Sequence, residues 1–382
     1  MIRLSEEQRL LRDSTRRLMD RHAPPEEVRR LDEAREYPYD LYDAWVEAGL
    51  LALPFPAAYG GLGGSVPDLV VVAREIAYTS PDLFMAYAGS VFCGLNIVAM
   101  GSDEQRAKWV EKLAKGEARM AIAMSEPDAG SDVGAIRTRA VRDGESWVLN
   151  GCKLWSTGAG ARETVINTYV RTDPHADHRK GLSLLLVDND APGVRCRKLD
   201  MLGRRSVGTF EVTFDDVCVP GARLIGEIDG GWQVALAGLQ VERIVSAAGN
   251  CGAAQRVVDM AAQYAQERTQ FGRPIGANQA VAHPIADMAT EVAAATALTW
   301  AAAERVAAGE DALELITMAK LKSSETFAAV ANRGMQVMGA YGYSMEYDMQ
   351  RFFRDSRSAT IAAGTSEMQR SLIARLMGLK VR

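Results

Sequence analysis

Glu242, followed by Arg243, is the first candidate for acid–base chemistry. It lies in residues 231–268, which contain no proline and repeat apolar side chains at three- and four-residue steps, so we predict one helix. Its buried stripe should contain Val234, Val241, Val245, Ala248 and Gly252.

The helix face that carries Glu242 is otherwise made of small residues, Ser246, Gly249 and Ala253. A carboxylate there either points into a cavity or lies under a closely packed neighbour. In a cavity it could act as a general base, and the ordinary alternative is a solvated or salt-bridged glutamate.

Two stretches near the middle of the chain offer polar groups and a large aromatic ring. Residues 123–135, AMSEPDAGSDVGA, present backbone amides and the hydroxyls of Ser125 and Ser131 to a polar ligand, although a simple loop between strands would also explain them. Residues 150–157 read as a turn and a strand with Trp155 and Thr157 on one face. The indole could be core or could lie against a planar ring.

A third group of motifs lies towards the C-terminus, in residues 268–272, 336–342, 354–355 and 363–370. We expect a helix to begin behind Gly364-Thr365-Ser366. A helix N-terminus at this point suits an anionic or carbonyl group.

The elements that position these residues fall into three segments. Residues 1–118 should be helical, with Ser5 capping a first helix, further helices at 39–50 and 66–78, and a capping box from Ser102 and Gln105. The intervening LPFPAAYGGLGG resembles a dinucleotide loop only superficially, because Pro54 and Pro56 stand where a strand should be, and we predict a turn.

Residues 119–225 change to short β-branched runs at 147–149, 164–171, 182–187 and 210–219, separated by glycine turns. Long helices return at 231–268, about 278–308, about 311–339 and from Ser366. We therefore predict a mainly α protein with a central β-domain: an N-terminal helical domain (1–118), a middle β-domain (119–225) and a C-terminal four-helix bundle (226–382).

The composition excludes several classes of partner. A net charge of -5 on 382 residues gives no reason to expect nucleic acid or an anionic membrane. The charged N-terminus is not expected to be a signal peptide, and no apolar run is expected to reach a membrane-spanning length of about 20 residues. Five scattered cysteines favour reduced thiols and a cytoplasmic location, and the four histidines suggest no metal site.

Taken in this order and at these spacings, the motifs resemble the acyl-CoA dehydrogenase family over essentially the whole chain. Residues 123–135 match the first signature of that family position for position. The resemblance implies a middle domain that is barrel-like, FAD held between it and the C-terminal helices, and a homotetramer built as a pair of dimers.

The resemblance also assigns the cofactor contacts. Met124, Ser125 and Ser131 would line the flavin and the acyl thioester, and Trp155 and Thr157 would lie at the isoalloxazine, with Thr157 near N5. Thr365 and Glu367 would contact FAD of the same subunit. The contacts to FAD of a neighbouring subunit would come from Arg268, Gln270, Phe271, Gln336, Gly339 and Ala340, and Gln279 completes the cofactor set.

The family removes an α-proton from a thioester and passes the β-hydrogen to flavin N5 as hydride. Most members carry the base at the position of Ala363, whereas isovaleryl- and long-chain-type members carry it on the helix, at the position of Glu242. Glu242 is therefore the expected base, and the Ala363 backbone N–H, with a ribityl hydroxyl, would bind the thioester oxygen. Arg243, Gly364 and Ser131 would contact the substrate.

The expected activity is FAD-dependent α,β-dehydrogenation of an acyl-CoA in fatty acid or amino acid catabolism, with electrons passed to an electron-transfer flavoprotein. Because Gln240 or Val241 replaces an acidic CoA contact of the family, a carrier-protein thioester stays open as the substrate. The alternatives are a reductase of the crotonobetainyl-CoA reductase type, an acyl-carrier-thioester oxidase or flavin monooxygenase, and a non-catalytic flavin-binding relative.

Overall fold

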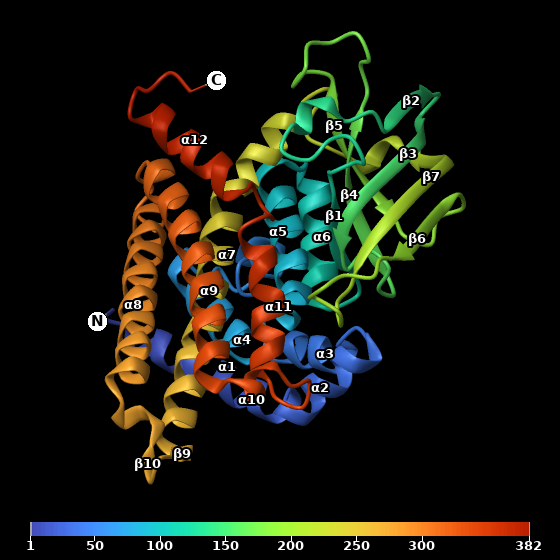
Figure 1. Cartoon of the computed structure of the whole chain (residues 1–382). Coiled ribbons are helices and arrows are strands. Elements are labelled where there is room, and N and C mark those ends of the chain that lie inside the picture. Colours follow the sequence, from blue (N-terminus) through green and yellow to red (C-terminus); the bar gives the residue numbers. More distant parts are fainter. Residues whose placement is uncertain (1, 382) are drawn as a thin grey trace. The chain divides into compact units, whose positions relative to one another are not determined.

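The computed structural model describes residues 2–381 and divides into two compact units (Figure 1). One unit, here the helical unit, is formed by Met1–Arg30, Ser65–Phe84 and Glu242–Arg382. The other, the sheet unit, is formed by Leu31–Gly64 and Met85–Val241. The predicted fold class, mainly helical with a central sheet, is confirmed, whereas the predicted domain boundaries stay a prediction.

The N-terminal third of the chain is helical, as expected, and serine caps fix where three of its helices begin. Ser5, Ser65 and Ser102 each accept a hydrogen bond from the backbone N–H three residues on, and the side chain at that position bonds back to the serine N–H. The helices are α1 (Glu6–His22), α2 (Pro25–Ala34), α3 (Tyr39–Glu47), α4 (Val66–Thr79), α5 (Leu83–Met100) and α6 (Asp103–Ala114).

The sheet unit is built on one eight-stranded sheet in the order β6-β7-β3-β2-β4-β5-β8, with β1 pairing in parallel with β4. The four longer strands were predicted, and the shorter ones were not. The strands are β1 (Arg119–Ala123), β2 (Arg139–Asp143), β3 (Ser146–Thr157), β4 (Thr164–Arg171), β5 (Leu182–Asp188), β6 (Val194–Lys198), β7 (Thr209–Pro220) and β8 (Leu224–Ile225).

Apolar side chains bury both faces of the centre of this sheet. Val165 and Tyr169 of β4 pack into a core with α5 and α6, whereas the alternate residues Ile166 and Val170 pack into a second core with β3, β5 and β7. From β3 the second core takes Trp147 and Leu149, in the first half of the strand.

The helical unit is organised around three long helices that run alongside one another in Figure 1: the part of α7 (Gly231–Glu267) from Glu242 onward, α8 (Gln279–Ala307) and α9 (Leu313–Met338). One apolar core joins α7, α8 and α9 to α11 (Met349–Ala359). The short hairpin of β9 (Thr269–Gln270) and β10 (Arg273–Pro274), α10 (Ala340–Tyr343) and α12 (Ser366–Leu376) complete the unit.

The middle of α7 is buried on nearly every side, which differs from the single stripe predicted. Val234, Val245, Ala248 and Gly252 are buried as expected and Val241 is half-buried, but Ile244, Ala247 and Ala254 are buried as well. A 3.6-residue period of apolar side chains shows only where one face of a helix is apolar and the opposite face is polar. A helix that is covered on all sides has no polar face, so its burial cannot be predicted from this period.

Helix α5 lies in the segment predicted to be helical, but its bounds were not predicted, because its eighteen residues are apolar throughout and show no period. By length and composition alone it could cross a membrane, contrary to our expectation for this chain. Most of it is buried within the protein, as is typical of a core helix.

Candidate functional site

Glu242 begins the part of α7 that belongs to the helical unit, and its carboxylate has no neutralising partner at close range. It is only partly exposed, and no residue from 2 to 381 forms a hydrogen bond or ion pair with it. Burial raises its pKa to about 7, although the charges of Arg243 and Lys320 oppose that shift. A carboxylate with a pKa near neutrality is suited to accept a proton at physiological pH.

The small residues that follow Glu242 on α7 lie under close neighbours. A Cβ added to Gly249 would come within 2.7 Å of the ring of Phe84, and Ala253 is fully buried. Of the two possibilities that the sequence left open for this face, close packing holds for the turns beyond Glu242.

A tight turn before α12 carries the second predicted catalytic group. Ala363 and Gly364 both adopt left-handed conformations, with φ of 55° and 88°. For alanine this conformation costs about 1–2 kcal/mol, so contacts from elsewhere must hold it. The N–H groups of both residues donate to no backbone or side-chain acceptor in the described chain, so the amide of Ala363 is free to bind a carbonyl oxygen.

Helix α12 begins as predicted, directly behind this turn. Thr365 is its N-cap, and the Thr365 hydroxyl accepts a hydrogen bond from the Met368 N–H at 3.3 Å. Glu367 lies exposed in the first helical turn. The arrangement agrees with a helix N-terminus that faces a carbonyl or an anion.

Two buried side chains that sequence reasoning missed hold the turn. Lys320 of α9 donates from Nζ to the carbonyl oxygens of Gly364 (2.6 Å) and Ala359 (3.3 Å), and Gln369 of α12 donates to that of Gly364 (3.2 Å). A lysine at helical spacing among the buried Ile316, Ser324 and Phe327 was the signal available in the sequence.

Arg243 lies beside the same turn. A Cβ on Gly364 would come 3.9 Å from a terminal nitrogen of Arg243, and the buried Arg243 Nε has no hydrogen-bond partner among the described residues. Burial lowers the pKa of Arg243, with Glu242 opposing. The structure thus brings together four predicted site residues in one unit: Glu242, Arg243, Ala363 and Gly364.

In the sheet unit, the predicted signature loop is fastened by a buried ion pair. Lys153 of β3 is fully buried and donates to Glu126 Oε1 (2.8 Å) and to the carbonyl of Met124 (3.0 Å). Glu126 also accepts the N–H groups of Arg137 (2.6 Å) and Thr138 (2.9 Å). Sequence reasoning missed the pair, although a lysine at an inward-facing strand position marked it.

Both members of this pair are charged at neutral pH. Burial lowers the pKa of Lys153 to about 8, against the attraction of Glu126. Desolvation alone would raise the pKa of Glu126, but the Lys153 charge and the hydrogen bonds from Lys153, Thr138 and Arg137 outweigh it and lower that pKa. The pair therefore ties the loop after β1 to strands β2 and β3.

Replacing Lys153 with methionine should leave the Glu126 charge buried without its cation. Removing one partner of a buried ion pair costs about 3–5 kcal/mol, and the two backbone donors to Glu126 favour the lower end, about 3 kcal/mol. Urea denaturation followed by tryptophan fluorescence measures the loss. Lys115→Met is the matched control, because Lys115 pairs with Glu111 at the surface, and it should change little. Equal losses of unfolding free energy in the two variants would show that the buried ion pair stabilises the protein no more than the surface pair does.

Trp155 lies at a β-bulge, where the pairing of β3 with β7 shifts between Lys153 and Ser156. Its φ of 65° is left-handed, which is rare for a bulky residue, and 54% of its surface is exposed. The core alternative for this indole is therefore excluded, and the backbone strain marks a site where the ring is presented outward.

The groups around Trp155 fit a flavin. The hydroxyls of Ser125, Ser131 and Thr157 make no hydrogen bonds within residues 2–381, and neither do the N–H groups of Ser125 and Ser131. An open aromatic face with unpaired donors and hydroxyls matches a planar ring that has polar edges. Met124 directly follows β1, is half-buried against the core with α5 and α6, and has its carbonyl bonded to Lys153 of β3.

The residues predicted to contact FAD of a neighbouring subunit gather elsewhere in the helical unit. In Figure 1 the β9–β10 hairpin and α12 lie at opposite ends of the bundle. Gln336 lies sixteen residues beyond Lys320 on α9, or about 24 Å along the helix. At the hairpin end, Phe271 is 98% exposed at the tip, and Arg268, Gln270, Gln279, Gln336, Gly339 and Ala340 are also at least partly exposed.

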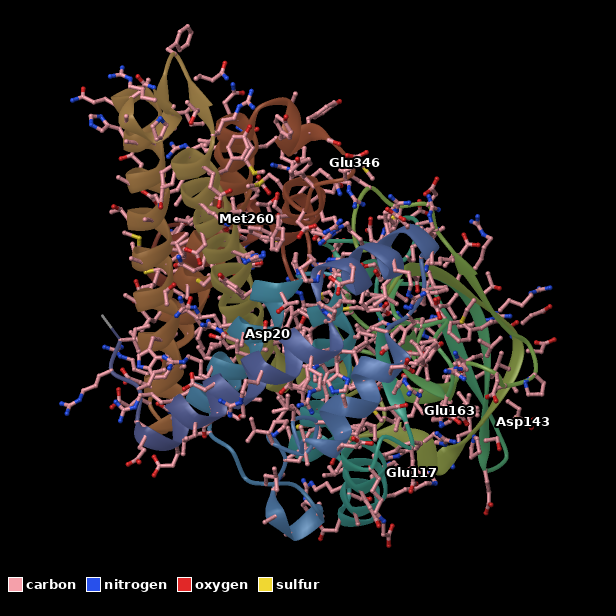
Figure 2. The ribbon with its side chains drawn as sticks, turned by 90° about the horizontal axis from the view of Figure 1, so that it is seen from below. Asp20, Glu117, Asp143, Glu163, Met260 and Glu346 are labelled. Carbon is pink, nitrogen blue, oxygen red and sulfur yellow. The ribbon has the colours of Figure 1, made fainter. Side chains whose placement is uncertain are left out.

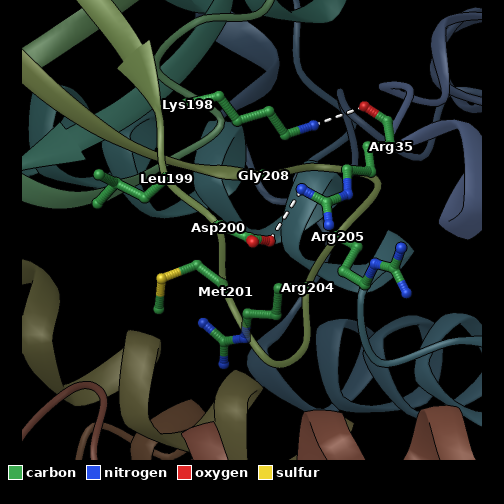
Figure 3. A pocket seen from close by; sticks show the side chains of 8 residues that line it. All are labelled: Arg35, Lys198, Leu199, Asp200, Met201, Arg204, Arg205 and Gly208. Atoms are coloured by element: carbon green, nitrogen blue, oxygen red, sulfur yellow. Dashed lines mark hydrogen bonds and ion pairs between the residues drawn. The ribbon is translucent and has the colours of Figure 1, made fainter.

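Two other hollows contain none of the predicted site residues. A cavity of about 400 Å³ in the helical unit is lined by residues that include Met260 and Glu346, which are labelled in Figure 2. A hollow of about 10 Å³ in the sheet unit is bounded by Lys198, which donates to the carbonyl of Arg35, and by the ion pair of Arg35 with Asp200 (Figure 3). Its volume is that of about one water, which is too small for a cofactor.

Comparison with known proteins gives the same picture along the whole chain. Models of the acyl-CoA dehydrogenase N-terminal, middle and C-terminal domains match residues 5–117, 121–217 and 229–378. An acyl-CoA dehydrogenase of Bacillus subtilis (strain 168) is 34% identical over 371 residues, which cover 97% of this chain and 96% of that protein. Acryloyl-CoA reductase (NADH) of Anaerotignum propionicum is 33% identical, with coverage of 97% and 94%.

The crystal structure of an acyl-CoA dehydrogenase from Geobacillus kaustophilus superimposes with a TM-score of 0.94, at 34% identity and with 98% of this chain and 99% of that chain covered. The chain belongs to the acyl-CoA dehydrogenase family, and it is an FAD-dependent oxidoreductase that acts on CH–CH bonds.

Proposed function

We propose that this protein catalyses the α,β-dehydrogenation of an acyl-CoA thioester, with Glu242 as the base and an electron-transfer flavoprotein as the electron acceptor. The observation that carries the proposal is the pairing, in one unit, of an unpartnered carboxylate whose pKa is about 7 with a turn whose Ala363 amide is free.

The chain's own residues account for the proton chemistry. The Ala363 N–H donates to the thioester oxygen and favours the enolate that forms as the α-proton leaves, and one such donor is worth about 10²–10³ in rate. Glu242 takes that proton onto its carboxylate. Arg243 and Lys320 keep the local potential positive, which favours the ionised form of the base before the reaction. Bound FAD supplies the acceptor for the β-hydrogen and its electron pair.

We further propose a homotetramer in which the hairpin end of each helical unit, with Arg268 and Phe271, contacts FAD of a neighbouring subunit. Two observations support separate cofactor contacts at the two ends of each helical unit: Phe271 is exposed, and Gln336 lies about 24 Å from Lys320 along α9. Ser131, Trp155, Thr157, Thr365 and Glu367 would serve the chain's own FAD. A cytoplasmic location is also proposed, because the five cysteines are scattered and odd in number, a pattern that favours reduced thiols.

The purified protein is expected to be yellow, to release FAD on denaturation and to elute as an oligomer. Anaerobic titration with acyl-CoA thioesters of increasing chain length and branching should bleach the flavin band with at least one of them. Acyl pantetheine thioesters, which lack the nucleotide of CoA, test whether CoA itself is recognised. A protein that incorporates FAD but is bleached by no thioester would contradict the proposed reaction.

The reverse reaction is a second candidate, because the reductase of Anaerotignum propionicum is similar over nearly the whole chain. The same groups would then act in reverse: protonated Glu242 returns the α-proton, and Ala363 binds the same oxygen. Mixing reduced protein with an enoyl-CoA distinguishes the two directions, since a reductase should be reoxidised faster than its oxidised form is bleached by the saturated thioester.

A further inference from the structure

Lys320 is an unusual residue for the interior of a helix bundle. It is 1% exposed, lies in the first third of α9, and directs its ammonium to the carbonyls of Ala359 and Gly364. A buried ammonium requires compensating partners. Both of these partners are backbone atoms of the segment that leads into α12.

The two carbonyls enclose the segment that contains Ala363. Residues 360–363 lie between them, the Ser366 N–H closes the turn on the Thr360 carbonyl at 3.1 Å, and Gln369 supplies a second donor to the Gly364 carbonyl. Because Ala363 is left-handed and its own N–H has no partner, these contacts from outside set the direction of that N–H.

The charge of Lys320 also acts on the second catalytic group. Lys320 and Arg243 both favour the ionised form of Glu242. The charged groups that act on Lys320 come from three helices: Glu242 and Arg243 of α7, Glu325 of α9, and Glu367 of α12. One side chain is thus coupled to the oxyanion amide through hydrogen bonds and to the base through its charge.

We propose that Lys320 is a positioning residue of the dehydrogenation site: by holding the Gly364 and Ala359 carbonyls it aims the Ala363 N–H at the thioester oxygen, and its charge supports the ionised Glu242. This inference rests on the proposed function. A lysine that only filled space in the bundle would affect stability but would change neither the polarisation of the substrate carbonyl nor the titration of the base.

The test compares Lys320→Met, which keeps the chain length without donor or charge, with Lys320→Gln, which keeps a donor, and Lys320→Arg, which keeps donors and charge. Lys322→Met is the matched control, because Lys322 lies two residues away on α9 and pairs with Glu291 of α8. The first readout is the infrared band of crotonyl-CoA labelled with ¹³C at the carbonyl, bound to the oxidised FAD-loaded protein.

Wild type and Lys322→Met should move this band to lower frequency on binding. Lys320→Met should lose at least half of the displacement, and Lys320→Gln should be intermediate. The rate of flavin reduction by the best acyl-CoA should fall about 10-fold or more in Lys320→Met, within the worth of one oxyanion donor. The pH range over which this reduction rate rises should move to higher pH in Lys320→Met and should stay unchanged in Lys320→Arg.

A wild-type band displacement and an unchanged pH profile in Lys320→Met would overturn the inference, even if that variant were less stable. If Lys320→Met does not fold, a wild-type displacement in Lys320→Gln has the same consequence. A wild-type protein that neither displaces the band nor is bleached by any thioester would remove the proposed function itself, and this inference with it.

Discussion

Replacing Glu242 with glutamine should slow the reduction of bound flavin by an acyl-CoA about 10²–10⁴-fold, which is the usual worth of a positioned general base. The amide has nearly the same volume as the carboxylate but cannot accept the α-proton. Substrate binding should change little, because no described residue depends on Glu242 for a hydrogen bond. Anaerobic stopped-flow absorbance at the flavin band measures the rate, and equilibrium titration measures binding.

The pH dependence provides an internal control for this experiment. Only the ionised carboxylate can accept the proton, so the wild-type rate should rise with pH up to about 7 and then level off. Glu242→Gln should lack that rise. Glu111→Gln, which removes an exposed carboxylate paired with Lys115 far along the chain from the site, should keep it. Bleaching of Glu242→Gln at close to the wild-type rate would mean that the carboxylate is structural.

Stability should move in the opposite direction to activity. The pKa of Glu242 in the folded protein, about 7, is above its usual value of 4.5, so between these pH values the folded state binds more protons than the unfolded state. Stability is therefore lost as the pH rises through this window. Glutamine avoids that loss, and Glu242→Gln should be at least as stable as the wild type above pH 7. Slow bleaching by this variant cannot then be explained by unfolding.

The chemistry-bearing residues could be predicted from the sequence where a motif or a helix start identified them. Ser102 with Gln105 and Thr365 before α12 are capping signals within four residues, and local signals of this kind survive in the folded chain. Trp155 and Thr157 could be placed on one strand for the same reason. The left-handed conformation of Trp155 could not, because it arises from a bulge against β7, more than fifty residues away along the chain.

The buried lysines show why the rest of the site could not be predicted. The partners of Lys320 are backbone carbonyls about forty residues away, and those of Lys153 are a carbonyl and a carboxylate across the sheet. Backbone atoms carry no signature in a sequence, so a lysine that binds them reads as a surface residue. The sequence indicated the position of Glu242 on its helix, but its raised pKa depends on burial by segments far away in the chain.

Helices and strands that lack a regular pattern of apolar and polar residues could not be delimited from the sequence, for a related reason. The uniformly apolar α5 shows no period. The five-residue strands β2 and β6 each contain two arginines and a further charged residue, so they look like exposed loops. Helix α11 is different, because its apolar residues Met349 and Phe352 recur at helical spacing. This pattern could have predicted α11 from the sequence. Residues Arg354-Asp355 inside the helix were interpreted only as part of a binding motif.

Moving the base from α7 to the turn before α12 should restore part of the activity that Glu242→Ala loses. If Glu242 and position 363 address the same α-hydrogen, Glu242→Ala combined with Ala363→Glu should reduce the flavin faster than Glu242→Ala alone. Ala363 already carries a Cβ in its left-handed conformation, so the longer side chain adds no new backbone strain. Recovery should be incomplete, because a base misplaced by about 1 Å can cost on the order of 10² in rate.

Two further variants show whether such a recovery is specific. Ala363→Glu alone should be harmful, because two carboxylates that meet at one atom repel and one takes up a proton. Ala362→Glu in the Glu242→Ala background places the same charge one residue away, on an exposed position, and should restore nothing. Stopped-flow reduction of all four variants by one acyl-CoA gives the coupling between positions 242 and 363, and the expected result is strong non-additivity. A double variant no faster than Glu242→Ala, with flavin and substrate still bound, would show that the two positions do not serve the same substrate atom in this protein.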